Sequence, residues 1–144
     1  MNVDCFLDTN IFVYAAAGHR AEPTKCKRAL ELIESANFGI STQVLQEFYV
    51  TVVRKIQAPL TPEKALEWIE QLDAFPCLSL DSSFVKIAAE TSVRHHLSYW
   101  DGAIVAAAET MGAGILYSED LNHGQRYGCV QVVNPFRHSE RHAH

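Results

Sequence analysis

The chain has 144 residues, 48% of them hydrophobic, and carries a formal net charge of −5 at pH 7. This length and composition predict a globular domain with a buried core and exclude a disordered chain. The negative charge argues against a broad surface for binding polyanions. No basic segment followed by an apolar stretch stands at the amino end, and no run approaches the roughly eighteen apolar residues that cross a bilayer. We therefore expect a soluble, cytoplasmic protein that does not contact a membrane.

Short apolar runs alternate with helical patterns along the chain. The expected strands cover 3–7, 39–41, 75–80, 114–117 and 130–133, and the expected helices cover 11–17, 25–35, 43–56, 62–72, 82–95 and 98–111. Strands that alternate with helices indicate a mainly parallel sheet. We therefore predict a single α/β domain over 1–144. Its three layers (α/β/α) have a central, mainly parallel sheet of four to five strands with helices on both faces, and 137–144 form a polar, frayed tail.

Four acidic residues stand where the predicted strands end or the predicted helices begin. Asp8 follows the first strand, and Asp120 follows the strand over 114–117. Glu47 lies in the first turn or so of the helix over 43–56, and Asp101 opens the helix over 98–111. In a parallel α/β sheet the carboxyl ends of strands and the amino ends of the following helices share one edge. All four acids are therefore expected on the same side of the protein, Asp101 least directly because its helix follows another helix.

Each acid also has a purely structural explanation. Asp8 and Asp120 are placed to cap the turns after their strands, and Ser98 to Asp101 has the spacing of a capping box. Glu47 is harder to explain in this way, because it lies in an otherwise apolar helix where an unpaired charge is costly. Four carboxylates crowded together repel one another unless cations hold them, so their coincidence predicts a metal site more than four separate caps.

Ligands that are all oxygen atoms favour a hard cation, Mg²⁺ or Mn²⁺. Zinc is disfavoured, because the four cysteines are scattered without a Cys-x-x-Cys pair and are expected to be reduced, structural thiols. Hard divalent ions held by a few carboxylates are the usual apparatus of phosphodiester cleavage, in which the metal activates water and stabilises the displaced oxygen. Nucleic acid is therefore a natural substrate.

The net negative charge argues less strongly against nucleic-acid binding once the distribution of charge is considered. Setting aside the four acids of the predicted site leaves 13 acidic residues against 12 Lys and Arg, so the rest of the surface is nearly neutral. The densest basic stretch, 20–28, contains Arg20, Lys25, Lys27 and Arg28 against Glu22 alone. Contact with a phosphate backbone and a solvated helix face both explain this stretch.

Five motifs, in this order along 3–136, resemble those of a known family. They are Leu7-Asp8-Thr9-Asn10, Gln46-Glu47-Phe48, Trp100-Asp101-Gly102-Ala103-Ile104-Val105-Ala106-Ala107-Ala108, Tyr117-Ser118-Glu119-Asp120-Leu121-Asn122-His123-Gly124-Gln125 and Val132-Val133-Asn134-Pro135-Phe136. The sequence is similar to the PIN-domain ribonucleases, and within them to the VapC-type toxins of bacterial and archaeal toxin–antitoxin pairs. The resemblance implies a PIN-like fold and an endoribonuclease dependent on Mg²⁺ or Mn²⁺.

The resemblance also implies roles for individual residues and partners. The metal-binding, catalytic acids are expected to be Asp8, Glu47, Asp101 and Asp120, and the residues that support or extend this shell are expected to be Thr9, Asn10, Ser118 and Asn122. Glu119, beside Asp120, remains open as a ligand in its place. RNA is the implied substrate. The implied protein partners are a second copy of the chain, in a homodimer, and an antitoxin that inserts a basic or aromatic segment into the acidic groove.

Two other functions remain open at this point. An aspartate-based phosphotransfer domain also places an aspartate at a strand end, but it requires a second acid beside Asp8 and a lysine near a late strand, and no lysine follows Lys86. A non-catalytic RNA- or protein-binding module of the same fold has no need of all four acids. Trapping phospho-aspartate at Asp8 favours the first alternative, and a melting temperature that no divalent ion changes favours the second.

Overall fold

The computed structural model describes residues 2–137 and contains a mostly parallel sheet with helices around it. The strands are β1 (Cys5–Leu7), β2 (Phe38–Ser41), β3 (Cys77–Leu78), β4 (Ile115–Tyr117), β5 (Arg126–Tyr127) and β6 (Val130–Val133). The helices are α1 (Thr9–Ala17), α2 (Pro23–Ser35), α3 (Thr42–Val50), the π-helical turn η1 (Thr51–Lys55), α4 (Pro62–Leu72), α5 (Ser82–His95) and α6 (Tyr99–Thr110). Apart from Arg137, the predicted frayed tail lies outside the described residues.

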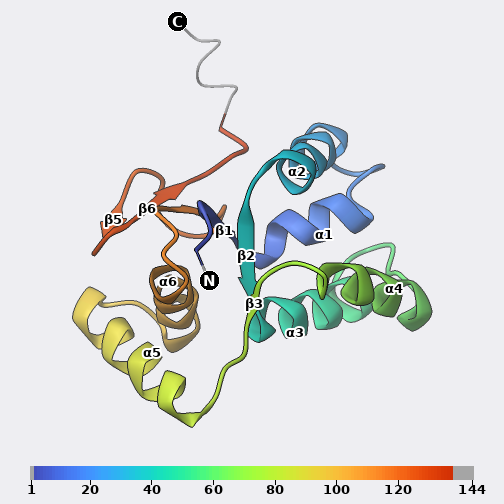
Figure 1. Ribbon diagram of the computed structural model, residues 1–144. Helices are drawn as coiled ribbons and strands as arrows, with labels where there is room; N and C mark the ends of the chain where they lie inside the picture. Colours follow the sequence, from blue (N-terminus) through green and yellow to red (C-terminus); the bar gives the residue numbers. More distant parts are fainter. Residues whose placement is uncertain (1, 138–144) are drawn as a thin grey trace, which may run out of the picture.

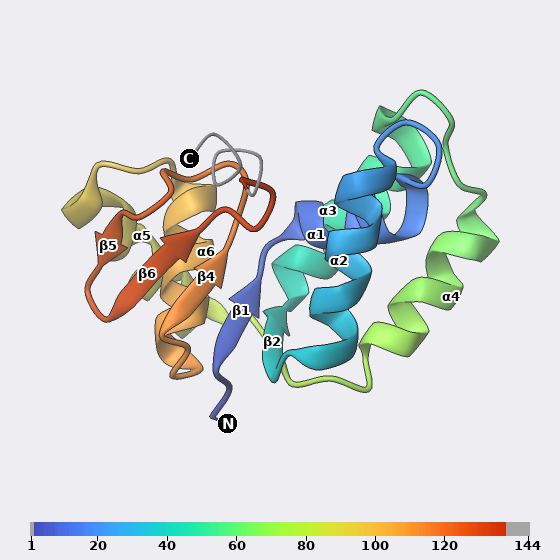
Figure 2. The same ribbon diagram turned by 90° about the horizontal axis from the view of Figure 1, so that it is seen from above.

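The strand order in the sheet is β3-β2-β1-β4-β6-β5, and every neighbouring pair is parallel except β5 and β6. The predicted α/β class and mainly parallel sheet are confirmed. Figure 2 shows β1 between β2 and β4, where both of its faces are covered, and Cys5, Phe6 and Leu7 are all buried. The central position of β1 explains why its sequence is an unbroken apolar run.

The sheet has six strands where four to five were predicted, because β5 was missed. Its two residues, Arg126 and Tyr127, pair antiparallel with Gln131 and Val130 across a two-residue turn in which Gly128 has a φ of 60°. A strand this short shows no alternation of polar and apolar residues. The strand predicted over 75–80 is also shorter in the structure, where only Cys77 and Leu78 pair with β2.

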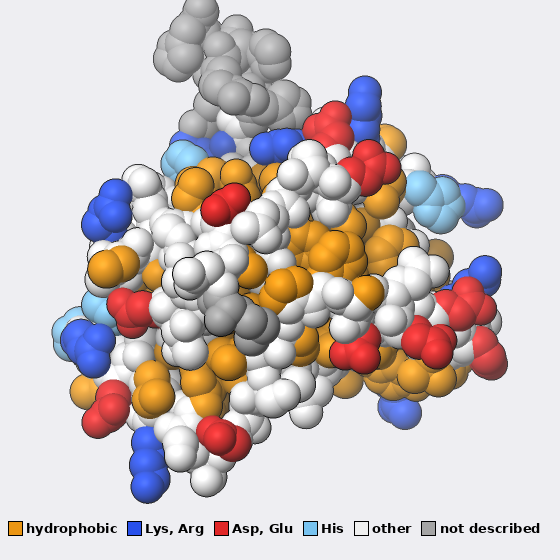
Figure 3. All heavy atoms as spheres, in the orientation of Figure 1, with side chains coloured by type: hydrophobic (Ala, Val, Ile, Leu, Met, Phe, Trp, Pro, Cys, Tyr) orange, Lys and Arg blue, Asp and Glu red, His pale blue; other side chains and the backbone are white. Residues whose placement is uncertain are grey.

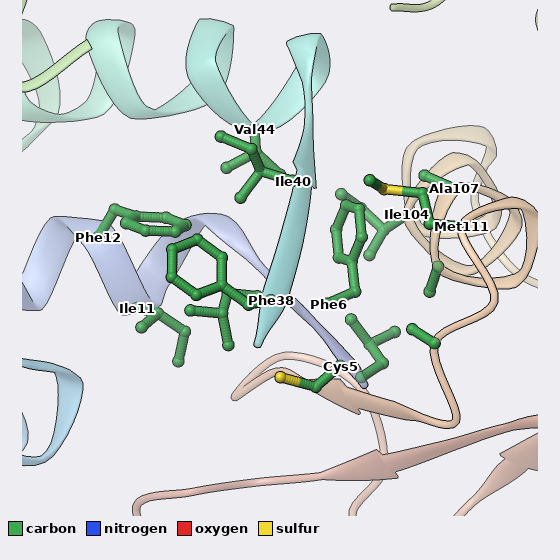
Figure 4. Close-up of a cluster of buried hydrophobic side chains, with 14 of the residues drawn as sticks. Cys5, Phe6, Ile11, Phe12, Phe38, Ile40, Val44, Ile104, Ala107 and Met111 are labelled. Atoms are coloured by element: carbon green, nitrogen blue, oxygen red, sulfur yellow. The ribbon is translucent and has the colours of Figure 1, made fainter. Parts of the chain in front are cut away.

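Helices pack on both sides of the centre of the sheet, as predicted. Figure 1 shows α5 and α6 on one side of β2 and α1 to α3 on the other. In Figure 4, Phe12 and Val44 approach β2 from α1 and α3. On the opposite side lie Ile104, on α6, and Met111, which directly follows α6. All four side chains are buried. Among residues 2–137, no helix combines the length and the apolar character needed to cross a bilayer.

The two helices α5 and α6 approach each other very closely at Gly102. A Cβ atom added to Gly102 would lie 2.6 Å from Ser92 Cβ and 2.8 Å from Ser92 Cα on α5. The next six residues of α6, 103–108, are also buried and include four alanines. Small side chains therefore let α6 fit between α5 and the sheet. Because Asp101 directly precedes Gly102, this packing also fixes the position of Asp101 relative to the sheet.

Candidate active site

Three neighbouring strands bring their carboxyl ends together in the middle of the sheet. β2, β1 and β4 are parallel neighbours. Asp8 directly follows β1, and the turn with Asp120 follows β4. β2 leads without a linker into α3, whose second turn carries Glu47. The topology therefore gathers these three acids at one edge, as parallel pairing predicts.

Asp8 is both a helix cap and part of this edge. Its Oδ1 atom accepts a hydrogen bond from Thr9 N (2.7 Å) at the start of α1, and its Oδ2 atom accepts one from Ser118 Oγ (2.8 Å). Its side chain is only 7% exposed. Burial raises the pKa of Asp8 to about 6, with further increases from the charges of Asp120 and Glu47 that the two hydrogen bonds oppose. The ionised form is thus held in an unfavourable environment.

Glu47 is held by side chains from two elements. Its Oε1 atom accepts a hydrogen bond from Thr9 Oγ1 (2.8 Å), and its Oε2 atom accepts one from Gln43 Nε2 (3.1 Å). Gln43 also donates to the carbonyl oxygen of Trp100 (3.1 Å), at the start of α6. These contacts explain how an acid is accommodated in an apolar helix. They also connect α3 to the segment that carries Asp101.

Asp120 faces Asn10 across the end of the sheet. Asn10 Nδ2 lies 3.2 Å from Asp120 Oδ1 and 3.1 Å from its Oδ2. Burial raises the pKa of Asp120, and the charges of Glu119 and Asp101 raise it further. Repulsion between Asp120 and Asp101 indicates that the acid from α6 belongs to the same electrostatic cluster as the acids at the strand ends.

A single cleft of about 480 Å³ is lined by all four predicted acids: Asp8, Glu47, Asp101 and Asp120. Asp101 is the third residue of α6, where its backbone N–H donates to Ser98 Oγ (3.1 Å), so the predicted capping arrangement exists alongside the cleft position. The acids thus come from four separate segments and meet at one concave surface. This is the kind of site at which ligands bind in open α/β sheets.

Comparison with protein families gives a match to the PIN domain over residues 5–127. The chain belongs to the PIN-domain family. No curated protein sequence matches it.

Solved structures with the same fold include toxins. VapC20 of Mycobacterium tuberculosis, described as a sarcin-ricin loop cleaving toxin, aligns with a TM-score of 0.64 at 20% identity over 81% of this chain and 89% of its own. A toxin–antitoxin complex from Klebsiella pneumoniae aligns with a TM-score of 0.68 at 16% identity over 92% and 98%. DNA-bound VapBC from Salmonella typhimurium aligns with a TM-score of 0.60 at 19% identity over 90% and 96%. These similarities confirm the fold of this PIN domain.

The four residues predicted to support the acids, and Glu119 as the alternative ligand, differ in whether they line the cleft of this PIN domain. Thr9 and Asn10 line it, and Ser118 lies beneath it in contact with Asp8. Glu119 instead contacts Tyr14 and Lys25, away from the residues that line the cleft. Asn122 is exposed and does not line the cleft either.

Sequence reasoning missed other residues that line the cleft, among them Gln43, Lys55 and Trp100. Gln43 stands four residues before Glu47, on the same face of the helix, and this spacing was an available signal. Lys55 ends the π-helical turn η1, which follows α3 without a break. The predicted helix over 43–56 covers both elements, but the π-helical turn was not foreseen, although such turns are frequent at functional sites.

The donor chemistry of the cleft fits a hard divalent cation. Its acids, with Thr9, Asn10 and Gln43, supply oxygen atoms only. Gln43 Oε1 is buried and has no hydrogen-bond partner within residues 2–137, so this wall has unused acceptor capacity. In the same part of the chain, no three His, Cys, Asp or Glu side chains converge as a ready metal site. Binding an ion therefore requires the carboxylates to move closer to a shared point than they are in this structure.

Proposed function

We propose that this PIN domain is an endoribonuclease dependent on Mg²⁺ or Mn²⁺. The observation that carries the proposal is the meeting of Asp8, Glu47, Asp101 and Asp120 in one cleft. Burial and mutual repulsion raise the pKa values of Asp8 and Asp120, which is the electrostatic situation that a bound cation relieves. Membership of the PIN-domain family, whose members are typically nucleases, adds support.

In this proposal the four acids would hold the ion, which would supply Lewis-acid chemistry: activation of a water molecule and stabilisation of the oxygen displaced from phosphorus. The chain's own groups orient the acids. Thr9 and Gln43 direct Glu47, Ser118 directs Asp8, and Asn10 directs Asp120. These contacts limit the reorganisation needed when an ion binds.

Two further residues of the cleft suit a single-stranded nucleic acid. Trp100 is 62% exposed although it belongs to a largely buried helix, and an exposed indole offers a surface on which an unstacked base packs. Lys55 is the one Lys or Arg that lines the cleft among the described residues. With a single cation in the cleft, stacking is expected to contribute more to binding than phosphate contacts. Figure 3 shows the opposite side of the molecule, from which β1 starts, and there Lys and Arg side chains stand apart and form no continuous basic area.

The residues around Asp8 disfavour a phosphotransfer domain. Thr9 and Asn10 follow Asp8 in place of a second acid. Among the described residues, the one lysine that lines the cleft is Lys55, which belongs to η1 and not to the end of a late strand. The non-catalytic binding module is the outcome to be distinguished by experiment.

The direct test is cleavage of a mixed single-stranded RNA by the purified chain with MgCl₂. The native chain, Asp8→Asn and Asp4→Asn are compared, each also with EDTA. Asp4→Asn is a matched control, because Asp4 is exposed and stands at the opposite end of β1 from the cleft. We expect cleavage by the native chain and by Asp4→Asn and its loss in Asp8→Asn and in EDTA. Equal cleavage by Asp8→Asn refutes the assignment, and RNA binding without cleavage by any protein supports the binding module.

We further propose that the protein acts as the toxin of a toxin–antitoxin pair, with an antitoxin partner and a homodimeric state. The likeness in fold to VapC20 and to toxin chains crystallised with their antitoxins supports this role. The test is to sequence RNA ends in cells after induction, with Asp101→Asn as control, because an endoribonuclease toxin leaves new ends that this variant does not produce. Light scattering of the purified chain tests the homodimer.

A further inference from the structure

Glu119 is held outside the cleft by two residues from different helices. Its Oε1 atom accepts a hydrogen bond from the Tyr14 hydroxyl of α1 (2.5 Å), and its Oε2 atom forms an ion pair with Lys25 of α2. Lys25 Nζ also donates to the Tyr14 hydroxyl (3.3 Å). The Lys25 and Glu119 side chains are 30% and 22% exposed. Partial burial favours such a contact over the weak ion pairs of an open surface.

Ser118, the residue before Glu119, also holds the turn that carries Asp120. Ser118 Oγ donates to Asp8 and accepts from the backbone N–H groups of Asp120 (3.2 Å) and Leu121 (3.4 Å). Ser118 thus ties the turn to the end of β1, while Glu119 ties it to α1 and α2. With both preceding residues held, Asp120 is left to face Asn10 and the cleft.

Two aromatic rings lie beside the Lys25 ammonium group. It lies 5.0 Å from the centroid of the Tyr14 ring and 5.6 Å from that of Phe136, and the two rings meet edge to face at 5.1 Å. The hydrogen bond to Glu119 raises the pKa of Lys25, so the ammonium group stays charged at neutral pH. On the same helix, Arg28 Nε donates to Pro135 O (3.4 Å).

These contacts change the interpretation of the basic stretch over 20–28. Lys25 and Arg28 have partners within the chain, so they are not simply cations waiting for phosphate. The structure therefore assigns part of this stretch to an internal role near the proposed site.

We infer that Tyr14, Lys25 and Glu119 form a clamp that positions Asp120 for metal binding. The inference rests on the proposed metal-dependent function. Glu119 and Asp120 are adjacent carboxylates, and Glu119 raises the pKa of Asp120 through its charge. Lys25 neutralises Glu119 and draws it toward α2, which lowers the repulsion in the cleft and fixes the backbone from which Asp120 extends. Glu119 is in this view a positioning residue and not a ligand.

The clamp and a ligand role for Glu119 predict opposite effects of removing Lys25. If Lys25 positions the turn, Lys25→Met weakens the binding of Mn²⁺, because Asp120 loses its fixed direction. If Glu119 is itself a ligand that Lys25 withholds, the same substitution frees it and tightens Mn²⁺ binding. Lys27→Met is a matched control, since Lys27 is an exposed lysine on the same helix.

The test is a calorimetric titration of the full chain with Mn²⁺. It compares the native protein with Lys25→Met, Lys25→Arg and Lys27→Met. We expect about tenfold weaker binding for Lys25→Met, the lower end of the loss seen when a direct partner of a metal ligand is removed, because Lys25 acts on Asp120 only through Glu119. Lys25→Arg keeps the charge and is expected to restore most of the affinity, and Lys27→Met is expected to match the native chain. Native or tighter binding by Lys25→Met overturns the clamp.

Two further variants test a ligand role for Glu119 and replace Lys25→Met if that variant does not fold. Glu119→Gln is expected to bind Mn²⁺ more tightly than Asp120→Asn does, and equal losses in the two overturn the clamp in favour of a ligand role. If Lys25→Met does not fold, Tyr14→Phe removes the hydrogen bonds of the Tyr14 hydroxyl to Glu119 and Lys25 and keeps the ring against Phe136. Native affinity in Tyr14→Phe then overturns the clamp. Absence of Mn²⁺ binding by the native chain overturns the proposed function and the clamp together, whereas native binding with an unaffected Lys25→Met overturns the clamp alone.

Discussion

Replacing Asp8 with Asn is expected to stabilise the metal-free chain at neutral pH and to destabilise it in acid. The folded-state pKa of Asp8 is raised from 3.8 to about 6. A carboxyl whose pKa is raised by folding loses stabilising free energy as the pH rises from its unfolded to its folded value, so the loss occurs between about pH 4 and pH 6. Each tenfold change in an ionisation constant is worth about 1.4 kcal/mol, so the loss totals about 3 kcal/mol.

Loss of a hydrogen bond to Asp8 opposes the stabilisation that Asp8→Asn gains at neutral pH. Asp8 accepts from Thr9 N and from Ser118 Oγ with separate oxygens, whereas Asn has one acceptor oxygen, so the substitution costs about 1 kcal/mol of hydrogen bonding at any pH. Asp8→Asn is therefore expected to be about 0.5 kcal/mol less stable than the native chain at pH 4, where part of the loss has already occurred, and about 2 kcal/mol more stable at pH 7.5. The order of stability reverses at about pH 4.5, where the native chain has lost about 1 kcal/mol.

Urea denaturation followed by circular dichroism, in EDTA at pH 4, 5.5 and 7.5, measures this difference. Asp4→Asn is the control, and its difference from the native chain should not follow the same course. Adding Mn²⁺ at pH 7.5 should stabilise the native chain by mass action and Asp8→Asn much less. A difference between native and Asp8→Asn proteins that is the same at pH 4 and pH 7.5 would refute the reasoning.

Three other substitutions test the packing and the cleft. Gly102→Ala should lower the free energy of unfolding by about 1–3 kcal/mol, because the new Cβ meets backbone atoms of Ser92; unchanged stability in urea denaturation contradicts this. Trp100→Ala should weaken binding of a single-stranded RNA by about fivefold or more in EDTA, and in a Trp68→Phe background the quenching of Trp100 fluorescence should report the same contact; the absence of both effects removes Trp100 from the RNA site. Lys55→Met should lower the salt dependence of RNA binding by about 0.7 in the log–log slope, as for one phosphate contact, and an unchanged slope excludes that contact.

The acids at the strand ends could be placed from the sequence because their position depends on topology alone. Once the strands before Asp8 and Asp120 are recognised as parallel, their carboxyl ends must share an edge. Asp101 was less secure, since its place depends on how closely α6 packs against α5 at Gly102. That distance is a property of tertiary packing and has no periodic signal in the sequence.

Local sequence patterns also fail to distinguish two kinds of helix that have similar residue preferences. The turn from Thr51 to Lys55 is π-helical, but its apolar spacing differs little from that of an ordinary helix. The sequence does not decide whether the Glu119 side chain points toward the cleft or away from it. That orientation depends on the contacts with Tyr14 and Lys25, which the structure shows. The partners that hold it lie about a hundred residues earlier in the chain, beyond the reach of any local motif.

The amide of Gln43 has a mechanical consequence for the cleft. By donating both to Glu47 on α3 and to the carbonyl of Trp100 on α6, it links two opposite walls through one rigid planar group. Moving the walls apart means breaking a partly buried hydrogen bond, which resists widening of the opening. For the proposed substrate, adaptation must then come from the nucleic acid. A strand that bends easily is expected to enter where a stiff duplex does not.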